Sequence, residues 1–229
     1  MGDDNLFTFS DQQAEPEKVA TDYASRFRGT ATPVVIDNGS HQCRVGWGSE
    51  DDPRLMFHSL VAKPRAKKDE ADGVVVGNDI QSGTLAKYII KSPHEGGVVT
   101  SWESQEYLLD HAFSCMGIDT EGSVQHPVVM TEAFCNLNVC RARMNELLFE
   151  AYGAPFVAYG VDSLFSHYLN NREAALAGYG LILSSGHHGS YVLPLIGGRV
   201  DASNGLRWVH ARHFFLWLAT LFLMLGWVV

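Results

Sequence analysis

The sequence has few cysteines, and the four it has form neither a redox pair nor a zinc-binding pattern. Cys135 and Cys140 are five residues apart, which fits neither a CxxC motif nor a zinc finger. Basic residues are also in the minority, with 17 lysines and arginines against 26 aspartates and glutamates and a formal net charge of −9. This balance argues against a surface that binds nucleic acid over its whole extent. We therefore expect free thiols in a reducing compartment and no broad nucleic-acid interface.

The N-terminal sequence "MGDDNLFTFSD" lacks the basic and then apolar segments of a secretory signal. Long apolar runs are scarce too, although 46% of the residues are hydrophobic, as expected of a globular protein. The exception is Phe214–Val229, which is almost wholly apolar. A bilayer-spanning helix needs about 17–25 such residues. This run therefore indicates either a short membrane anchor or arbitrary sequence read past a splice junction, and in both cases we expect a membrane-associated or aggregated chain.

Two stretches of the same design predict hairpins that turn on serine and glycine. Val34–Asp37 and Gln42–Trp47 alternate like two strands around the turn Asn38-Gly39-Ser40. The second stretch reads "YGLILSSGHHGSYVLPL" and begins at Tyr179. Leu55–Ala62 is expected to add a third strand to the first hairpin. A repeated hairpin of this kind suggests that the fold is duplicated.

Helices and strands alternate between the two hairpins. Thr100 and Glu103 have the spacing of a capping box and predict a helix that ends at Gly117. A buried strand, "HPVVMTE", precedes a helix over Cys140–Tyr152, and a strand, "FVAYG", precedes a helix capped by Asp162. Three initial strands followed by this alternation predict an α/β fold with a partly parallel sheet, in the ribonuclease-H-like layout.

Several segments in this order resemble the actin family. They are "IDNGS", similar to the family's first phosphate loop, "HPVVMTEAFCN", and "RMNELLFEAYGAPFVAYGVDSLFSHY". The resemblance runs from about Pro33 to Asp201 and implies an incomplete actin-like ATPase fold. The domains it implies are a polar leader (1–30), a first lobe (31–175) with a small charged-loop subdomain (about 55–92), the start of a second lobe (176–203) and an unrelated hydrophobic tail (204–229).

The resemblance also assigns a nucleotide site, in which small turn residues would cradle phosphate with backbone N–H groups. Its residues would be Asp37, Gly39, Ser40, Arg44, Ser185 and Gly186. The family's second loop has two aspartates where this sequence has Ser184 and His187, and the family's water-orienting glutamine is matched to Glu146. Magnesium prefers oxygen ligands, above all carboxylates, so this site is degenerate. We expect no ATP hydrolysis, no metal site and no resident cofactor; ATP with magnesium would belong to a full-length relative.

Other sites are weaker candidates. His187 and His188 could bind a metal, but the sequence positions no third ligand beside them. Ser40 or Ser185 as a hydrolase nucleophile would need a histidine base and an orienting acid, and no convincing set is present. The segment Lys63–Lys68, "KPRAKK", indicates either a nuclear import signal or DNA-phosphate contact, or simply a solvated loop.

Taken together, the resemblance implies a non-catalytic actin-related subunit of a nuclear ATP-dependent chromatin remodelling complex of the inositol-auxotrophy class, in truncated form. Such a subunit would act as a docking body in chromatin remodelling and DNA repair. Its implied partners are the remodeller's motor subunit, a small companion subunit and, indirectly, the nucleosome and its histones. Two alternatives stay open: an ATP-binding switch with weak or no hydrolysis, and a tail-anchored membrane module that uses Phe214–Val229.

Overall fold

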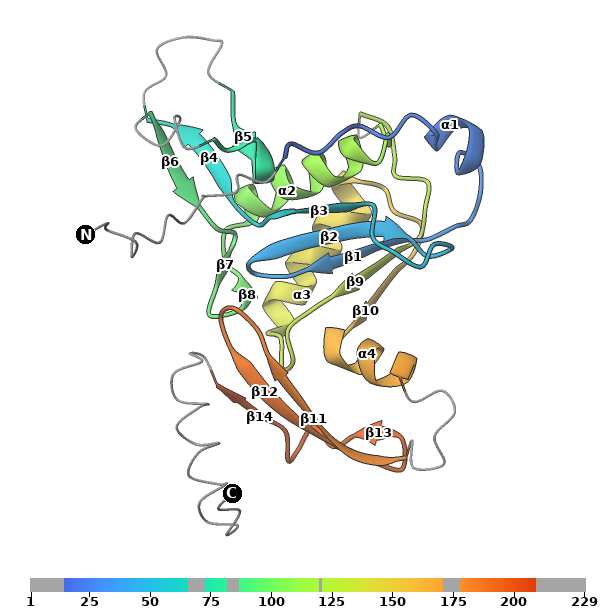
Figure 1. Cartoon of the computed structure of the whole chain (residues 1–229), viewed down its shortest axis with the longest axis vertical. Helices are drawn as coiled ribbons and strands as arrows, with labels where there is room; N and C mark the ends of the chain where they lie inside the picture. Colours follow the sequence, from blue (N-terminus) through green and yellow to red (C-terminus); the bar gives the residue numbers. More distant parts are fainter. Residues whose placement is uncertain (1–14, 66–72, 82–86, 120, 171–177, 209–229) are drawn as a thin grey trace, which may run out of the picture.

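The computed structural model describes residues 15–65, 73–81, 87–119, 121–170 and 178–208. Its centre is a five-stranded mixed sheet in the order β10-β9-β1-β2-β3 (Figure 1). These strands are β1 (Val34–Asn38), β2 (Gln42–Trp47), β3 (Leu55–His58), β9 (Val128–Thr131) and β10 (Val157–Gly160).

The first hairpin forms as the sequence predicts. β1 pairs antiparallel with β2, and β2 pairs antiparallel with β3. The predicted third strand, Leu55–Ala62, is too long, because the chain leaves the central sheet at Ser59 and Leu60. Its second half forms β4 (Val61–Pro64), which pairs with other strands in a separate sheet. That three-stranded sheet also contains β5 (Val75–Val76) and β6 (Tyr88–Lys91), and a small hairpin follows it with β7 (His94–Glu95) and β8 (Val98–Val99).

The alternating middle of the chain builds the parallel half of the sheet. β9 lies parallel to β1, and β10 lies parallel to β9. Parallel neighbours require crossover connections, and the intervening helices supply them. The crossover helices are α2 (Trp102–Cys115) and α3 (Asn138–Asn145), and a further helix, α4 (Asp162–Asn170), follows β10. The predicted α/β architecture with a mixed sheet is therefore confirmed.

The predicted capping box at the start of α2 is wrong. The N-cap residue is Ser101, and its side chain donates to the Ser104 hydroxyl at 2.9 Å instead of capping the helix. Glu103 faces away from the helix start and pairs with Lys63 at 2.6 Å. The predicted helix end holds, because Gly117 adopts a left-handed backbone with φ 78°.

The predicted helix over Cys140–Tyr152 is in fact two segments. α3 is followed by a π-helical segment, Glu146–Ala151, and the Tyr152 N–H bonds to the Leu147 carbonyl five residues back. This wider turn changes which residues face inward. Leu148 is fully buried, whereas Ala151, three residues further on, is exposed.

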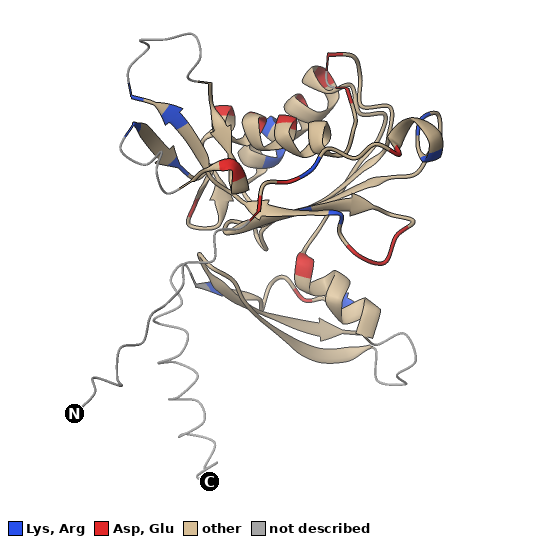
Figure 2. Ribbon diagram, turned by 45° about the horizontal axis from the view of Figure 1, so that its top comes forward, with Lys and Arg blue, Asp and Glu red and all other residues tan. Residues whose placement is uncertain are grey.

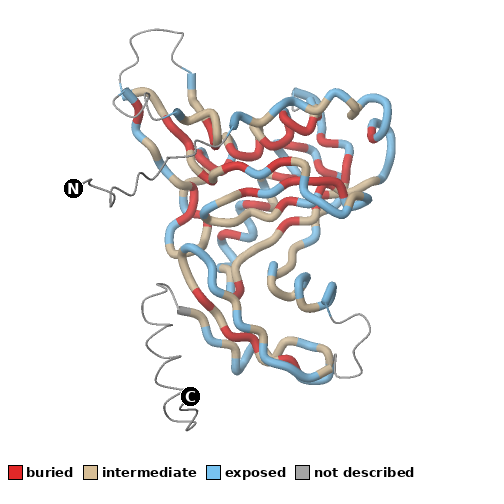
Figure 3. Tube along the Cα trace, in the orientation of Figure 1, coloured by how far each residue is buried: buried red, intermediate tan, exposed pale blue. Residues whose placement is uncertain are grey.

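The hydrophobic core lies between the central sheet and its helices. Val34, Ile36 and Val45 of the sheet are fully buried, as are Ala112 and Phe113 of α2. Figure 3 shows these buried stretches concentrated in the central sheet and in α2. Burial of this many large apolar side chains is the main favourable term for folding such a body.

Part of the predicted polar leader belongs to this body. A short helix, α1 (Tyr23–Arg26), precedes Phe27, whose ring stacks on Trp47 with centroids 4.1 Å apart. The Ala20 N–H donates to the Cys115 carbonyl at 2.7 Å, and Arg54 pairs with Asp22 at 2.7 Å. From Ala20 onward, these residues are therefore packed structure rather than a loose leader.

The second predicted hairpin forms a separate four-stranded sheet, below the central one in Figure 1. β11 (Tyr179–Ser185) and β12 (Ser190–Ile196) pair over seven residues. β13 (Arg199–Val200) and β14 (Leu206–Trp208) add to the other edge of β12. The first residues of the predicted hydrophobic tail thus join this sheet, while 209–229 lie outside the described residues.

Candidate functional site

The first Ser-Gly turn is held in a shape that only glycine allows at its centre. A Cβ on Gly39 would lie 2.5 Å from the Gln42 carbonyl oxygen, which is closer than real contacts permit. The Ser59 hydroxyl donates to the Gly39 carbonyl at 2.6 Å and fixes the turn from outside. The turn between β1 and β2 is therefore tight and anchored.

The second turn joins β11 to β12. The Gly186 N–H donates to the Gly189 carbonyl at 2.8 Å, and the Ser185 and Ser190 hydroxyls lie 3.0 Å apart across the base of the turn. His187 and His188 occupy the tip between these glycines.

The structure brings the two turns together across one cleft of about 340 Å³. The imidazoles of His41 and His187, one from each tip, stack with ring centroids 4.7 Å apart. The predicted site residues that line this cleft are Asp37, Gly39, Ser40, Arg44, Ser184, Ser185, Gly186 and His187. Residues more than 140 positions apart in the sequence thus share one site.

The Asp37 carboxylate is already engaged on both oxygens. Arg44 donates to Oδ2 at 3.0 Å, and the Thr131 hydroxyl donates to Oδ1 at 2.8 Å. The same Thr131 oxygen accepts the Asn38 N–H at 2.9 Å, so β1 and β9 are tied together at their ends. A cation bound here would compete with the Arg44 guanidinium for the carboxylate.

Burial and neighbouring imidazoles lower the pKa of two histidines near the two tips. Burial lowers the pKa of His41, and the neighbouring His187 and His58 lower it further. His58 lies on the far side of His41, with ring centroids 5.1 Å apart. Burial lowers the pKa of His94 to about 4, and the adjacent His188 acts in the same direction. Near neutral pH, His41 and His94 are therefore uncharged.

Glu146, matched by resemblance to a water-orienting glutamine, does not lie in the cleft. It belongs to the π-helical segment, pairs with Arg143 at 2.8 Å and lines a different hollow with Trp102. Besides Asp37 and Glu132, the carboxylate of Asp162 at the start of α4 lines the cleft. The Tyr191 hydroxyl donates to Asp162. Burial, followed by Asp162, raises the pKa of Tyr191 to about 12.

Sequence reasoning therefore missed several cleft residues, namely Thr131, Glu132, Asp162, Tyr191 and Arg207. One signal could have indicated Asp162 and Thr131. Both stand at the carboxyl ends of parallel strands, which is where ligands bind in open α/β sheets.

A family model described as Actin matches residues 29–203, more than half of the chain. The chain belongs to the actin family.

Curated relatives of this actin-family chain carry a more specific name. Actin-related protein 5 of Homo sapiens is 42% identical over 205 residues, which cover 87% of this chain and 34% of that protein. Actin-related protein 5 of Gallus gallus is 40% identical over 210 residues, or 89% of this chain and 34% of that protein. The Actin-like protein arp5 of Schizosaccharomyces pombe is 43% identical over 175 residues, which cover 76% of this chain and 23% of that protein. The chain spans about a third or less of the length of these relatives.

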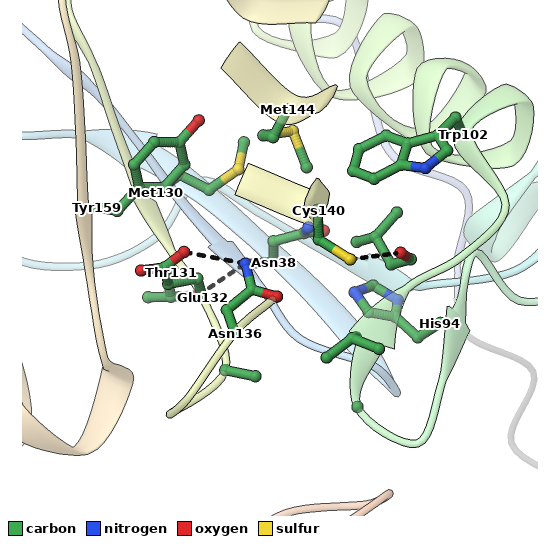
Figure 4. Close-up of a pocket in the computed structure, with 14 residues that line it drawn as sticks. Asn38, His94, Trp102, Met130, Thr131, Glu132, Asn136, Cys140, Met144 and Tyr159 are labelled. Atoms are coloured by element: carbon green, nitrogen blue, oxygen red, sulfur yellow. Dashed lines mark hydrogen bonds between the residues drawn. The ribbon is translucent and has the colours of Figure 1, made fainter. Parts of the chain in front are cut away.

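Beside the cleft, this actin-family chain has a second, smaller cavity of about 30 Å³ (Figure 4). Asn38, His94, Met130, Cys140 and Tyr159 help to line it. Its volume suits about one water molecule. Among the residues that the structure describes, the His94 Nδ1 atom has no hydrogen-bond partner, which fits a bound water rather than a larger ligand.

Other expected features have mixed outcomes. All four cysteines are free; Cys135 is exposed and the other three are buried. Within the described ranges, no group of three histidine, cysteine, aspartate or glutamate side chains could hold a metal ion. Likewise, no described helix is long and apolar enough to cross a bilayer. The tail Phe214–Val229 and the second half of the basic segment Lys63–Lys68, residues 66–68, lie outside the described residues.

Proposed function

We propose that this chain is a non-catalytic actin-family subunit of a nuclear ATP-dependent chromatin remodelling complex of the inositol-auxotrophy class. In such a complex it serves as a docking body in chromatin remodelling and DNA repair. The proposal is supported by the similarity to relatives named Actin-related protein 5 in animals and plants, and in fungi.

The chemistry of the cleft supports the proposal that this subunit is non-catalytic. Ser184 and His187 offer a hydroxyl and an imidazole at the tip of the second turn, and magnesium binds neither well. The ring of His187 stacks on that of His41, so the two tips contact each other directly. Asp37 is engaged by Arg44 and Thr131. Such an arrangement favours a closed contact between the two sheets over a metal-nucleotide complex.

The partners that fit this role are the remodeller's motor subunit, a small companion subunit and, through them, the nucleosome and its histones. The proposed location is the nucleus. Affinity purification of the tagged full chain from nuclear extract, followed by mass spectrometry, tests this directly. We expect a remodelling motor subunit and core histones to co-purify, with a tag-only extract as the control. Recovery of the chain without any remodelling subunit would contradict the proposal.

A nucleotide-dependent switch is the second candidate. It is favoured by the first turn, which presents Asp37, Gly39, Ser40 and Arg44 to the second turn across the cleft. Ligand that binds only the folded state stabilises it, by about 2.7 kcal/mol at a hundredfold excess over Kd. Thermal unfolding with ATP and magnesium together, and with each alone, separates the two candidates. A docking body shows the same unfolding temperature in all conditions, whereas a switch is stabilised by the complete ligand.

A further inference from the structure

Four histidines form a continuous row of imidazoles that crosses from the central sheet to the second sheet. His58, at the end of β3, lies beside His41 in the β1–β2 turn, with ring centroids 5.1 Å apart. His41 stacks on His187 with 4.7 Å between centroids and 26° between ring planes, and His187 lies 4.8 Å from His188. Figure 1 shows the β11–β12 tip directly below the β1–β2 turn. The contact between the two tips is therefore made of titratable rings.

The charge on these rings decides whether the tips attract or repel each other. His41 and His187 are both exposed, so a proton can reach either ring from water without any unfolding. Neutral aromatic rings stack favourably. Two charged imidazoles at the same separation repel each other, because like charges that close together disfavour the charged forms.

The second hairpin offers no opposite charge to balance a protonated His187. Residues 179–196, which form the whole hairpin, contain no aspartate, glutamate, lysine or arginine. Figure 2 shows β11 and β12 in the colour of uncharged positions, tip included. A carboxylate that stabilises a charged ring here has to come from another element.

The carboxylates that line the cleft are bound to other donors. They are Asp37, Glu132 and Asp162. The first pairs with Arg44, the second pairs with Arg141, and the third accepts the Tyr191 hydroxyl. Arg44 and Arg207 also line the cleft, and a guanidinium keeps its positive charge. The groups around the stack therefore do little to stabilise positive charge on it.

The pKa of His41 agrees with this geometry. Burial lowers it from the usual value, and the imidazoles of His187 and His58 lower it further. A histidine with a depressed pKa favours the folded contact fully above about pH 6.5, and this contribution declines as the pH falls below that value. Burial also lowers the pKa of His94 to about 4, so that ring stays mostly neutral at pH 5.

Two further contacts join the sheets at the base of the second hairpin, and their donors do not change between pH 7 and pH 5. Arg207 donates to the Gly96 and Phe134 carbonyls and keeps its charge. Tyr191, paired with Arg207 in the sheet, donates to Asp162. The pKa of Tyr191 is raised to about 12, mainly by burial, so its hydroxyl keeps the proton. The tips can therefore part while the base stays joined.

We propose that the stack of His41 on His187 is a pH-sensitive latch between the central sheet and the second sheet. The latch is closed while both rings are neutral. It opens when both rings carry a proton, so that the tips separate and the cleft widens around the base at Tyr191 and Arg207. This device does not depend on the proposed partners of the chain.

Distances between spin labels test the latch in the full chain. Met56→Cys in β3 and Leu183→Cys in β11 report across the two sheets, and both positions are exposed, by 49% and 52%. The labels are placed in a Cys135→Ser background, where the remaining cysteines are buried. In buffer with EDTA, which removes metal ions, we expect double electron–electron resonance to show a longer distance at pH 5 than at pH 7.5, reversibly. An unchanged distance would overturn the proposal.

A label pair outside the second sheet controls for loss of the fold. Met56→Cys with Val139→Cys, at the start of α3, should give the same distance at both pH values. Val139 is 64% exposed, so the label does not disturb the core. If this pair lengthens as much as the pair across the sheets, the change is general unfolding and the latch is refuted.

Variants of the rings identify the groups that titrate. His41→Phe with His187→Phe keeps two stacked rings that cannot be charged, so the short distance should persist at pH 5. His167→Phe on α4, outside the cleft, is the matched control and should leave the pH response unchanged. A pH response that survives in the double phenylalanine variant would contradict the proposal.

Salt provides a test that needs no substitution in the stack. At about 1 M salt, charges are screened beyond about 3 Å, so repulsion between exposed charged rings weakens. The lengthening at pH 5 should therefore shrink as the salt concentration rises in the chain with both histidines. A pH response of the same size at low and high salt would count against repulsion between His41 and His187 and would overturn the latch.

Discussion

Leu148→Ala is the sharpest test of how the core is built. Leu148 is fully buried, although it lies in a π-helical segment whose inward face the helical period of the sequence does not define. The substitution removes three carbon atoms from the core. At about 0.8 kcal/mol for each buried methylene-sized group, the transfer loss alone is about 2.4 kcal/mol. The unfilled cavity adds to this, so we expect a total of about 2–5 kcal/mol.

Phe149→Ala is the matched control, because this neighbour in the same segment is 45% exposed. It should cost less than about 1 kcal/mol, as surface substitutions usually do. Urea unfolding followed by circular dichroism measures both. With a slope of about 2 kcal/mol per M, Leu148→Ala should lower the midpoint by about 1 M or more. Equal midpoints for the two variants would refute the inward placement of Leu148.

Three further predictions concern the cleft and the small cavity beside it. The double variant Ser184→Asp with His187→Asp should still release no phosphate from ATP in a coupled assay, since Asp37 stays paired with Arg44; magnesium-dependent release would contradict our account of the site. Lowering the pH from 7 should destabilise the fold, because the pKa of His94 is depressed to about 4. The free energy of folding that the uncharged His94 contributes is complete above about pH 6.5 and declines as the pH falls toward 4. The loss attributable to His94 should approach about 3 kcal/mol, and His94→Gln should flatten the profile of urea midpoint against pH; an unchanged profile would count against this role. Arg207→Ala should raise amide hydrogen exchange near Gly96, since Arg207 donates to the Gly96 and Phe134 carbonyls at 2.7 and 3.1 Å; unchanged exchange would show that these bonds do not hold the second sheet.

Much of the fold could be predicted because its signals are local. The hairpins at Asn38-Gly39-Ser40 and Ser185-Gly186 combine alternating apolar residues with turn chemistry, and both form. The split of Leu55–Ala62 could not be predicted in this way. Both halves are apolar enough for a strand, and only tertiary pairing sends the second half to another sheet. The π-helical segment after α3 could not be predicted for a related reason. One extra residue in a turn shifts the inward face of the helix without any change in composition.

The site shows where sequence reasoning stops. Each turn could be predicted alone, but the stack of His41 on His187 depends on how two separate sheets meet. The assignment of Glu146 followed a resemblance along a helix, whereas the cleft is formed where strands end. Asp162 stands two residues after the end of β10, which pairs with β9, and it contacts Tyr191 from the second sheet. Its carboxylate accepts the Tyr191 hydroxyl, and this bond ties the start of α4 to β12 beside Ser184. The cleft of this chain is therefore crossed by a contact between two imidazoles and by one between a phenol and a carboxylate, in addition to the bonds of Arg207.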